Sequence, residues 1–253
     1  MNRLTPAGLV VLLSAVFLAM TDFFVVNVAL ADIARDLSAS TSSLELVVAG
    51  YAVAYALGLV IGGRLGDAFG RRRLFVLGMA AFTAFSALCG LAWSPGSLVA
   101  FRVLQGLSSA MMVPQVLATL QATTEGPSRA RALSAFGATG GLAAVFGQLG
   151  GGLIVAADLA GTGWRPVFLL NVPVGIVAIV AALRVLPDTR SDRPAAPDLV
   201  GTVLLGATVL ALLVPLVEGR AQGWPVWGWV SLGLAAPLAA ALLVAEGLSL
   251  IHI

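Results

Sequence analysis

The sequence predicts an all-α polytopic membrane protein, and three observations support this fold class. The 253 residues carry only 26 charged side chains, 14 of them arginine and 12 acidic. Hydrophobic residues make up 59% of the chain, and the mean hydropathy is +1.01. The charges leave eight uncharged stretches of 18 to 28 residues. Because about 20 helical residues cross a hydrocarbon core of about 30 Å, these stretches can span a bilayer, and a soluble globular domain is excluded.

Each of the eight stretches predicts one transmembrane helix. They are too continuously apolar for the strands of an outer-membrane barrel, which alternate in polarity over about ten residues. The first continues past Asp22 to Leu30 and is too long for a secretory signal, so we expect a retained helix. Only Arg102 interrupts the third and fourth, and Trp93 to Gly96 supplies the turn between them. The stretches are Leu4 to Thr21, Leu46 to Gly63, Leu74 to Phe101, Val103 to Thr124, Ala132 to Ala157, Pro166 to Leu183, Leu199 to Val217 and Ala221 to Ala245.

The arginines predict the orientation of the chain, because short cytoplasmic loops are enriched in basic residues. With the amino terminus in the cytoplasm, ten arginines lie inside, three lie outside and Arg102 lies within a span. The absence of lysine and the wealth of alanine and glycine suggest a GC-rich bacterial genome. We therefore expect a multi-pass protein of a bacterial inner membrane with a cytoplasmic amino terminus. The inner arginines are Arg3, Arg64, Arg71, Arg72, Arg73, Arg129, Arg131, Arg184, Arg190 and Arg193, and the outer ones are Arg35, Arg165 and Arg220.

The longest polar connection divides the chain into two groups of helices. It carries three prolines and five charges from Leu186 to Asp198. We expect a six-helix bundle over residues 1–186, a cytoplasmic linker over 187–198 and two extra transmembrane helices over 199–247. The last six residues, 248–253, read Leu-Ser-Leu-Ile-His-Ile, which is similar to a translated sequencing adapter. We expect them to lie outside the native fold, and so give His252 no role.

Several functional classes find no support in the sequence. The net charge is only +2, and no basic helix face with stacking aromatics points to nucleic acid. Cys89 is the single cysteine and has no neighbours with metal-ligand spacing, so neither a metal site nor a cofactor is expected. An intramembrane enzyme needs a nucleophile and a base at the same depth, and the sequence offers none. We therefore predict that the protein is not an enzyme.

The most specific motif follows the second span. Gly58, Gly62, Gly66 and Gly70 recur every fourth residue, so they share one helical face that lets a neighbouring helix approach closely. The segment 63–73 resembles the signature loop of the major facilitator superfamily, G-x-L-x-D-x-x-G-R-R, with alanine at position 68 where a basic residue is usual. The resemblance implies a conformational latch formed by Gly63, Asp67, Gly70, Arg71 and Arg72. The alternative is that the arginines only anchor the loop to anionic lipid.

Further motifs resemble the 14-span drug:proton antiporter, or multidrug efflux, branch of that superfamily. The segment 22–31 is similar to D-x-x-x-x-N-x-A-L-P without its final proline, and 102–106 is similar to R-x-x-Q-G. The segment 164–175 resembles W-R-x-x-F-x-x-N-x-P-x-G. The antiporter motif G-P-x-x-G-G corresponds to Gly147, Gln148, Gly151 and Gly152, with glutamine replacing the proline. That replacement puts the expected helix bend at risk.

The resemblance implies a major facilitator fold of which this chain holds the amino-terminal six-helix bundle and two further helices. Such transporters bind substrate between two halves and alternate access. The carboxyl-terminal half would then be missing, and we expect the chain not to transport alone. The alternatives are a transporter for a metabolite or sugar on the same scaffold, or a membrane scaffold fragment.

Asp22 and Arg102 are the charges that interrupt membrane-depth helix. An ionised group at the bilayer centre costs at least about 2.5 to 3.5 kcal/mol, so each should face a cavity or a partner. Their positions along the first and fourth spans allow them to meet. We predict a protonation switch in which proton or substrate binding breaks the pair, and a permanent structural ion pair is the alternative.

Contacts to a hydrophobic or cationic substrate are expected from methionine, aromatic and amide side chains, because these repack around differently shaped molecules. Packing alone would also explain such residues. The expected partners are therefore this substrate, protons and the lipid bilayer. The candidates are Asn27, Tyr51, Tyr55, Gln105, Met111, Met112 and Gln115.

Overall fold

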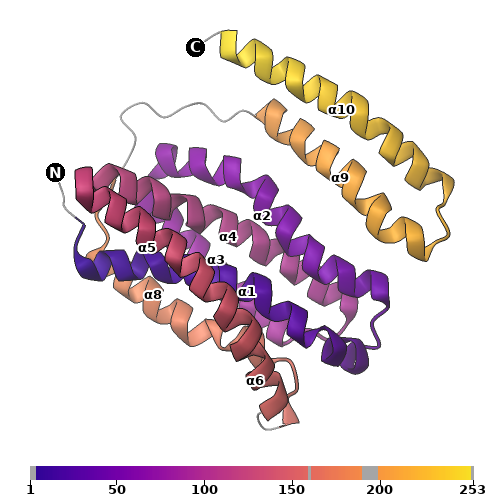
Figure 1. Cartoon of the computed structure of the whole chain (residues 1–253), viewed down its shortest axis with the longest axis horizontal. Helices are drawn as coiled ribbons and strands as arrows, with labels where there is room; N and C mark the ends of the chain where they lie inside the picture. Colours follow the sequence, from indigo (N-terminus) through magenta and orange to yellow (C-terminus); the bar gives the residue numbers. More distant parts are fainter. Residues whose placement is uncertain (1–3, 159–160, 190–198, 252–253) are drawn as a thin grey trace. The chain divides into compact units, whose positions relative to one another are not determined.

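The computed structural model describes residues 4–158, 161–189 and 199–251, and these are helical apart from short connections (Figure 1). The chain forms two compact units, Met1–Ala195 and Ala196–Ile253. Residues 190–198 of the expected linker and His252 of the expected adapter lie outside the described residues. The first unit contains the candidate site.

Three of the first four helices of this unit begin with a side-chain cap. They are α1 (Pro6–Leu37), α2 (Thr41–Phe69), α3 (Arg71–Gly90) and α4 (Pro95–Thr123). Proline opens α1 and α4, and the preceding Thr5 and Ser94 side chains accept hydrogen bonds from backbone N–H groups of the first turn. The turn predicted at Trp93 to Gly96 is confirmed, because α3 ends before it and α4 begins within it.

The remaining helices of the first unit are interrupted. One long helical stretch consists of α5 (Gly126–Val145), the π-helical segment η1 (Phe146–Gly150) and α6 (Gly151–Ala157). The next consists of α7 (Pro166–Leu169) and α8 (Asn171–Val185), separated at Leu170. The second unit is the hairpin α9 (Leu199–Ala221) and α10 (Val226–Ile251).

The helices bear out the prediction of a polytopic membrane protein. Within the described ranges, seven helical stretches are long and apolar enough to cross a membrane. They correspond to α1, α2, α3, α4, the α5–α6 stretch, the α7–α8 stretch and α10. The remaining predicted span is helical as α9, whose apolar section is Val203–Leu216. The chain is therefore a multi-pass membrane protein.

The glycine face of α2 packs against α4, as its spacing predicts. A Cβ atom added to Gly58 would lie 2.6 Å from the Ala110 Cβ, and one added to Gly62 would lie 2.9 Å from the Ala110 carbonyl carbon. Both distances are shorter than van der Waals contact, so only glycine permits this approach. Gly70 plays a different part, because its φ of 102° makes the sharp turn from α2 to α3.

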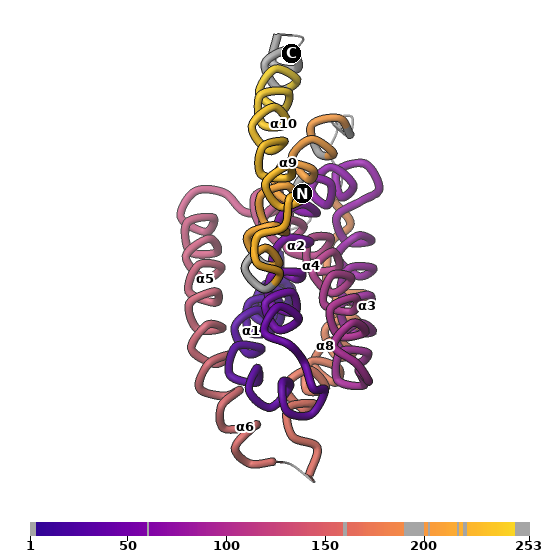
Figure 2. The backbone as a smooth tube through the Cα atoms, turned by 90° about the vertical axis from the view of Figure 1, so that its right-hand side faces the viewer, coloured from indigo at the N-terminus to yellow at the C-terminus, as the bar shows by residue number. Residues whose placement is uncertain are grey.

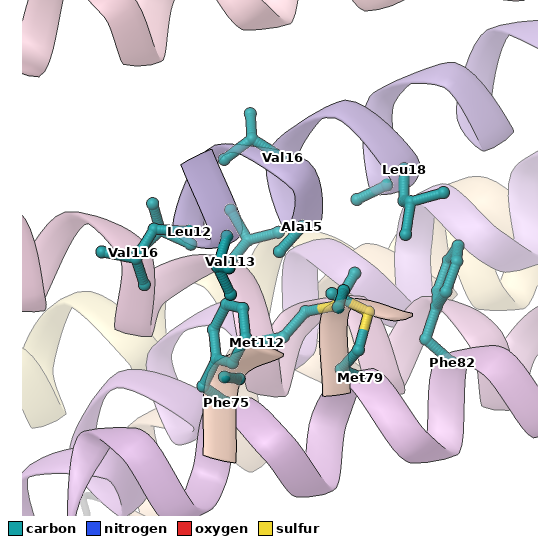
Figure 3. Close-up of a cluster of buried hydrophobic side chains, with 14 of the residues drawn as sticks. Leu12, Ala15, Val16, Leu18, Phe75, Met79, Phe82, Met112, Val113 and Val116 are labelled. Carbon is teal, nitrogen blue, oxygen red and sulfur yellow. The ribbon is translucent and has the colours of Figure 1, made fainter. Parts of the chain in front are cut away.

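Helix α1 lies centrally in the first unit and packs against α5, α8, α4 and α2 (Figure 2). Two clusters of buried apolar residues surround it. One includes Leu12, Ala15, Phe75, Met79 and Met112, whose side chains meet in Figure 3. The other follows further along α1 and is built around Val25, Val26, Cys89, Leu98 and Phe168. The candidate site lies between these two clusters.

Candidate functional site

The two membrane-depth charges form a buried ion pair. The Arg102 Nη1 of α4 donates to the Asp22 Oδ2 of α1, across 80 positions of sequence. Both side chains are 0% exposed. A buried charge is costly unless an opposite charge and hydrogen bonds compensate it, and here each charge is the compensation for the other. The structure thus brings together the two residues that the sequence singles out.

Arg102 is also held by groups other than the carboxylate. Its Nε donates to the Val47 carbonyl at 3.2 Å, and its Nη1 donates to the Gln105 Oε1 at 2.8 Å. The guanidinium carbon lies 4.3 Å from the ring centroid of Tyr51 and 5.6 Å from that of Phe168, within cation–π range. Among the described residues, no hydrogen-bond acceptor faces Nη2. The cation would therefore keep several partners if the carboxylate became neutral.

Asp22 also accepts hydrogen bonds from two amides. The Gln105 Nε2 donates to its Oδ1 at 2.9 Å, and the Asn171 Nδ2 donates to the same oxygen at 2.8 Å. Both amides also donate to the Ser86 Oγ, at 3.1 and 2.9 Å. Ser86 in turn donates to the Phe168 carbonyl at 2.9 Å. In the sequence, Asn171 stands out only as the asparagine of the 164–175 motif, with no role in the site, and Ser86 does not stand out at all.

The polar network is a layer between two apolar layers. On α1, Asp22 follows Ala19 of one buried cluster and precedes Val25 of the other. On α3, Ser86 lies between Phe82 and Cys89 in the same way. The site is consequently enclosed from both directions along the helix axes. In such low-dielectric surroundings, charge and hydrogen-bond interactions are stronger than in water.

Two of the predicted substrate contacts lie beside this network. Tyr51 is buried, donates to the Ala19 carbonyl at 2.9 Å and pairs with the Ser109 hydroxyl at 2.8 Å. Its ring stacks on that of half-buried Tyr55, with centroids 6.3 Å apart. Aromatic rings thus connect the guanidinium with a partly exposed surface.

The other predicted substrate contacts differ in exposure. Asn27 is exposed and donates to its own helix, and Met111 is half-buried. Gln105, Met112 and Gln115 are 0% exposed. Gln105 is taken up by the polar network, Met112 by the apolar cluster and Gln115 by a 2.7 Å hydrogen bond to the Gly62 carbonyl. In this conformation none of the three faces an open surface, and their role in substrate contact stays a prediction.

The signature loop is tied together by Arg71. Its Nη2 and Nε donate to the Asp67 Oδ1 at 2.8 and 3.2 Å, and its Nη1 donates to the Ala118 carbonyl of α4 at 3.3 Å. Arg72 donates to the Leu183 carbonyl of α8. A Cβ added to Gly63 would meet nothing within 4 Å, so packing does not require glycine there. Lipid anchoring alone does not account for Arg71, whose side chain is only 14% exposed.

The antiporter motif coincides with the π-helical segment η1. A Cβ on Gly147 would lie 2.9 Å from the Phe24 Cβ, and one on Gly151 would lie 2.9 Å from the Val28 Cγ2, so both glycines pack against α1. Gln148 is exposed, and Gly152 has open space. The helix is therefore irregular at the motif even though glutamine replaces the proline, because the π-helical segment interrupts the regular hydrogen-bond pattern.

A second polar cluster lies at the far end of α1, and it includes Trp164 and Arg165, the first two residues of the 164–175 motif. The Trp164 Nε1 and the Arg165 Nη1 donate to the Asp36 Oδ2 at 3.0 and 2.6 Å. These residues border an open pocket of about 650 Å³. The pocket does not include the Asp22 network. We therefore interpret the cluster as a structural contact that holds α1 to the segment before α7.

Comparisons with known proteins decide the family. The family model described as Major Facilitator Superfamily matches residues 12–250. The chain belongs to the major facilitator superfamily. This is a family of transporters rather than enzymes.

Curated relatives are named for antibiotic export or resistance. The chain is 43% identical over 224 residues to "Probable actinorhodin transporter" of Streptomyces coelicolor, covering 88% of this chain and 39% of that protein. It is 37% identical over 250 residues to "Tetracenomycin C resistance and export protein" of Streptomyces glaucescens, covering 98% and 45%. It is 38% identical over 219 residues to a puromycin resistance protein of Streptomyces alboniger, covering 86% and 42%. The chain thus spans less than half the length of these relatives, and the resemblance to drug-efflux members of the superfamily is confirmed.

Solved structures support the fold alone. The peptide transporter POT in complex with sulfate matches with a TM-score of 0.64 at 19% identity, covering 90% of this chain and 49% of that chain. A bacterial homolog to the human lysosomal transporter Spinster, inward-facing and unoccupied, matches with a TM-score of 0.60 at 22% identity, covering 94% and 60%. The predicted amino-terminal part of the major facilitator fold is confirmed.

Proposed function

We propose that this chain is part of a proton-coupled transporter that exports hydrophobic or cationic drugs by alternating access. The observation that carries the proposal is the fully buried Asp22–Arg102 ion pair. Ionisable groups in transmembrane helices are rare and mark ion pathways. The antibiotic export and resistance named for the relatives supports a drug-like substrate.

The mechanism starts from the ion pair with Asp22 ionised. When water reaches the site, Asp22 takes up a proton and its attraction to Arg102 is lost. The guanidinium keeps the Val47 carbonyl, the Gln105 amide oxygen and the Tyr51 ring as partners. The pair between α1 and α4 is weakened, so the helices can shift without leaving an unpaired cation.

Substrate would bind on the side where the aromatic rings reach a partly exposed surface. Tyr55 is half-buried, and its ring stacks on Tyr51, which lies over Arg102. Asn27 and Met111 are the other accessible candidates. A cationic substrate near these rings repels the guanidinium and favours the charged carboxylate, so substrate binding and proton binding oppose each other. This opposition is what antiport requires.

The two glycine-containing motifs would serve the conformational change. The proposed cytoplasmic latch between α2, α3 and α4 consists of Gly63, Gly70, Arg72 and the Arg71–Asp67 pair. The irregular segment around Gly147 and Gln148 would let α5 bend against α1. The counterpart of the latch would lie in the carboxyl-terminal half of the same transporter, which this chain alone does not supply. We place the protein in a bacterial inner membrane with its amino terminus in the cytoplasm, following the arginine distribution.

The test is drug export by a full-length transporter that contains this sequence. Cells that express it should accumulate less of a fluorescent cationic drug than cells without it, and a protonophore should abolish the difference. Asp22→Asn cannot carry the proton, so its export should fall to the level of cells without the transporter while membrane insertion persists. Normal proton-driven export by Asp22→Asn would remove the carboxylate from the mechanism.

A further inference from the structure

Asn171 occupies a special position at the break between α7 and α8. It is the first residue of α8, and Leu170 separates it from α7. Its side chain is almost fully buried and reaches α1 and α3 at once, with donor distances of 2.8 Å to the Asp22 Oδ1 and 2.9 Å to the Ser86 Oγ. The amide therefore links the start of α8 directly to the proposed proton site.

The hydrogen bonds of Ser86 fix which way the two amides point. Its hydroxyl proton is directed to the Phe168 carbonyl, so its oxygen accepts and both amides must present N–H groups to it. The Gln105 orientation is fixed again by its Oε1, which accepts from the Arg102 Nη1. Both amides consequently offer only donors to Asp22.

The two carboxylate oxygens of Asp22 are therefore unequal. Oδ1 accepts from Gln105 and Asn171, which uses both of its lone pairs. Oδ2 accepts from Arg102 alone, which leaves one lone pair for a proton. An incoming proton at Oδ1 would have to displace an amide donor, whereas one at Oδ2 displaces no donor.

We propose that Asn171 is a positioning residue that confines protonation of Asp22 to Oδ2, the oxygen that faces Arg102. The inference rests on the proposed function, in which Asp22 carries the exchanged proton. A hydronium ion gives its proton to Oδ2, an O–H bond forms and neutral water leaves. The new proton displaces no donor, but it turns the oxygen that Arg102 contacts into the hydroxyl oxygen of a neutral carboxyl group, which accepts a hydrogen bond much more weakly than a carboxylate oxygen. Proton binding and weakening of the guanidinium contact therefore become one event.

Removal of the Asn171 amide would separate these events. Oδ1 would regain a lone pair, and a proton there would leave Oδ2 as a carbonyl oxygen that still accepts from Arg102. The carboxyl group would be neutral while the guanidinium stayed in place, so protonation would no longer loosen α1 from α4. Among the residues that the structure describes, three charged or titratable side chains surround the Asp22 carboxyl group: Arg102 on α4, Tyr51 on α2 and Cys89 on α3. In the described parts of α5, η1, α7 and α8, the ionisable side chains Arg129, Arg131 and Arg184 form no contact with the network that the structure records.

The first experiment uses this chain in lipid nanodiscs. Asn171→Leu removes the donor with little change in shape, and Thr83→Val is the matched control. Thr83 lies one turn from Ser86 at the same α3–α8 contact, and its hydroxyl donates to the Met79 carbonyl rather than to the network. Magnetic resonance of ¹³C-labelled aspartate and ¹⁵N-labelled arginine follows the Asp22 carboxyl and the Arg102 guanidinium as the pH is lowered.

The native chain and Thr83→Val should change both signals over the same pH range. In Asn171→Leu the carboxyl signal should change while the guanidinium signal stays as it is. Coupled changes in Asn171→Leu would overturn the proposal.

The second experiment uses export by the full-length transporter and separates this proposal from the proposed function. Asn171→Leu should lose proton-driven export at every pH. Asn171→Asp should export only in acidic medium, because its protonated carboxyl can donate to Oδ1 as the amide does; this recovery also demonstrates a folded protein. Activity of Asn171→Asp that is independent of pH would contradict the positioning role. If Asp22→Asn is inactive and Asn171→Leu exports like the native protein, this proposal fails alone, whereas normal export by Asp22→Asn defeats the proposed function itself.

Discussion

Removing a single charge of the Asp22–Arg102 pair should destabilise the helix bundle strongly. Removing both charges together should destabilise it by less than the sum of the two single removals. Asp22→Asn leaves a guanidinium with neutral partners in a site that is 0% exposed, and Arg102→Leu leaves a carboxylate with only amide donors. Removing one partner of a buried ion pair costs about 3 to 5 kcal/mol, because the other charge stays buried with neutral partners alone and no opposite charge. Each variant should therefore insert but unfold more easily.

The double variant Asp22→Asn with Arg102→Leu measures the interaction itself. A buried pair that is replaced as a whole often costs little, because both desolvation penalties disappear together. We expect the double variant to cost less than the sum of the single variants by about 3 kcal/mol, the upper range for groups in direct contact. The free energy of unfolding can be followed by circular dichroism during SDS titration of the micelle-bound chain. Additive costs, or single costs below about 1 kcal/mol, would refute the view that these charges compensate each other in a dry site.

Two further predictions concern the packing and the signature loop. Gly62→Ala should lower the free energy of unfolding by about 3 kcal/mol, since its Cβ would collide with the α4 backbone, whereas Gly137→Ala, which has open space, should be neutral or slightly stabilising. Arg71→Lys keeps the charge but loses the two-nitrogen contact to Asp67, so it should cost about 1 kcal/mol in the same titration. Equal stability of Gly62→Ala and Gly137→Ala would contradict the α2–α4 packing. An Arg71→Lys chain as stable as the native one would contradict the role of the two-nitrogen contact between Arg71 and Asp67.

The sequence predicts well those features that local chemistry determines. Long uncharged stretches predict the spans, and Trp93 to Gly96 predicts the turn between α3 and α4. The glycines at every fourth residue of α2 predict the face on which a neighbouring helix, here α4, approaches closely. The proximity of Asp22 and Arg102 follows from a simple argument, because a charge in lipid needs a partner. These inferences need no knowledge of the other helices.

The remaining features depend on contacts between distant segments. Ser86 and Asn171 are neutral and can lie in a span without a charged partner. Nothing local indicates that the Asn171 amide reaches the Asp22 carboxylate across 149 positions, or that it also donates to Ser86. The break at Leu170 and the π segment also escape the sequence, since apolar periodicity does not distinguish an interrupted helix from a regular one. The burial of Met112 and Gln115 depends on which face of α4 meets its neighbours.

The most direct test of the account is the release of protons when substrate binds. A purified full-length transporter that contains this sequence is kept in weakly buffered detergent solution, acidic enough for Asp22 of the drug-free protein to have taken up its proton, and a cationic drug is added while a pH indicator is read. We predict that the native protein acidifies the solution and that Asp22→Asn, although it still binds the drug, does not. Equal acidification by the two proteins would show that the exchanged proton comes from another group.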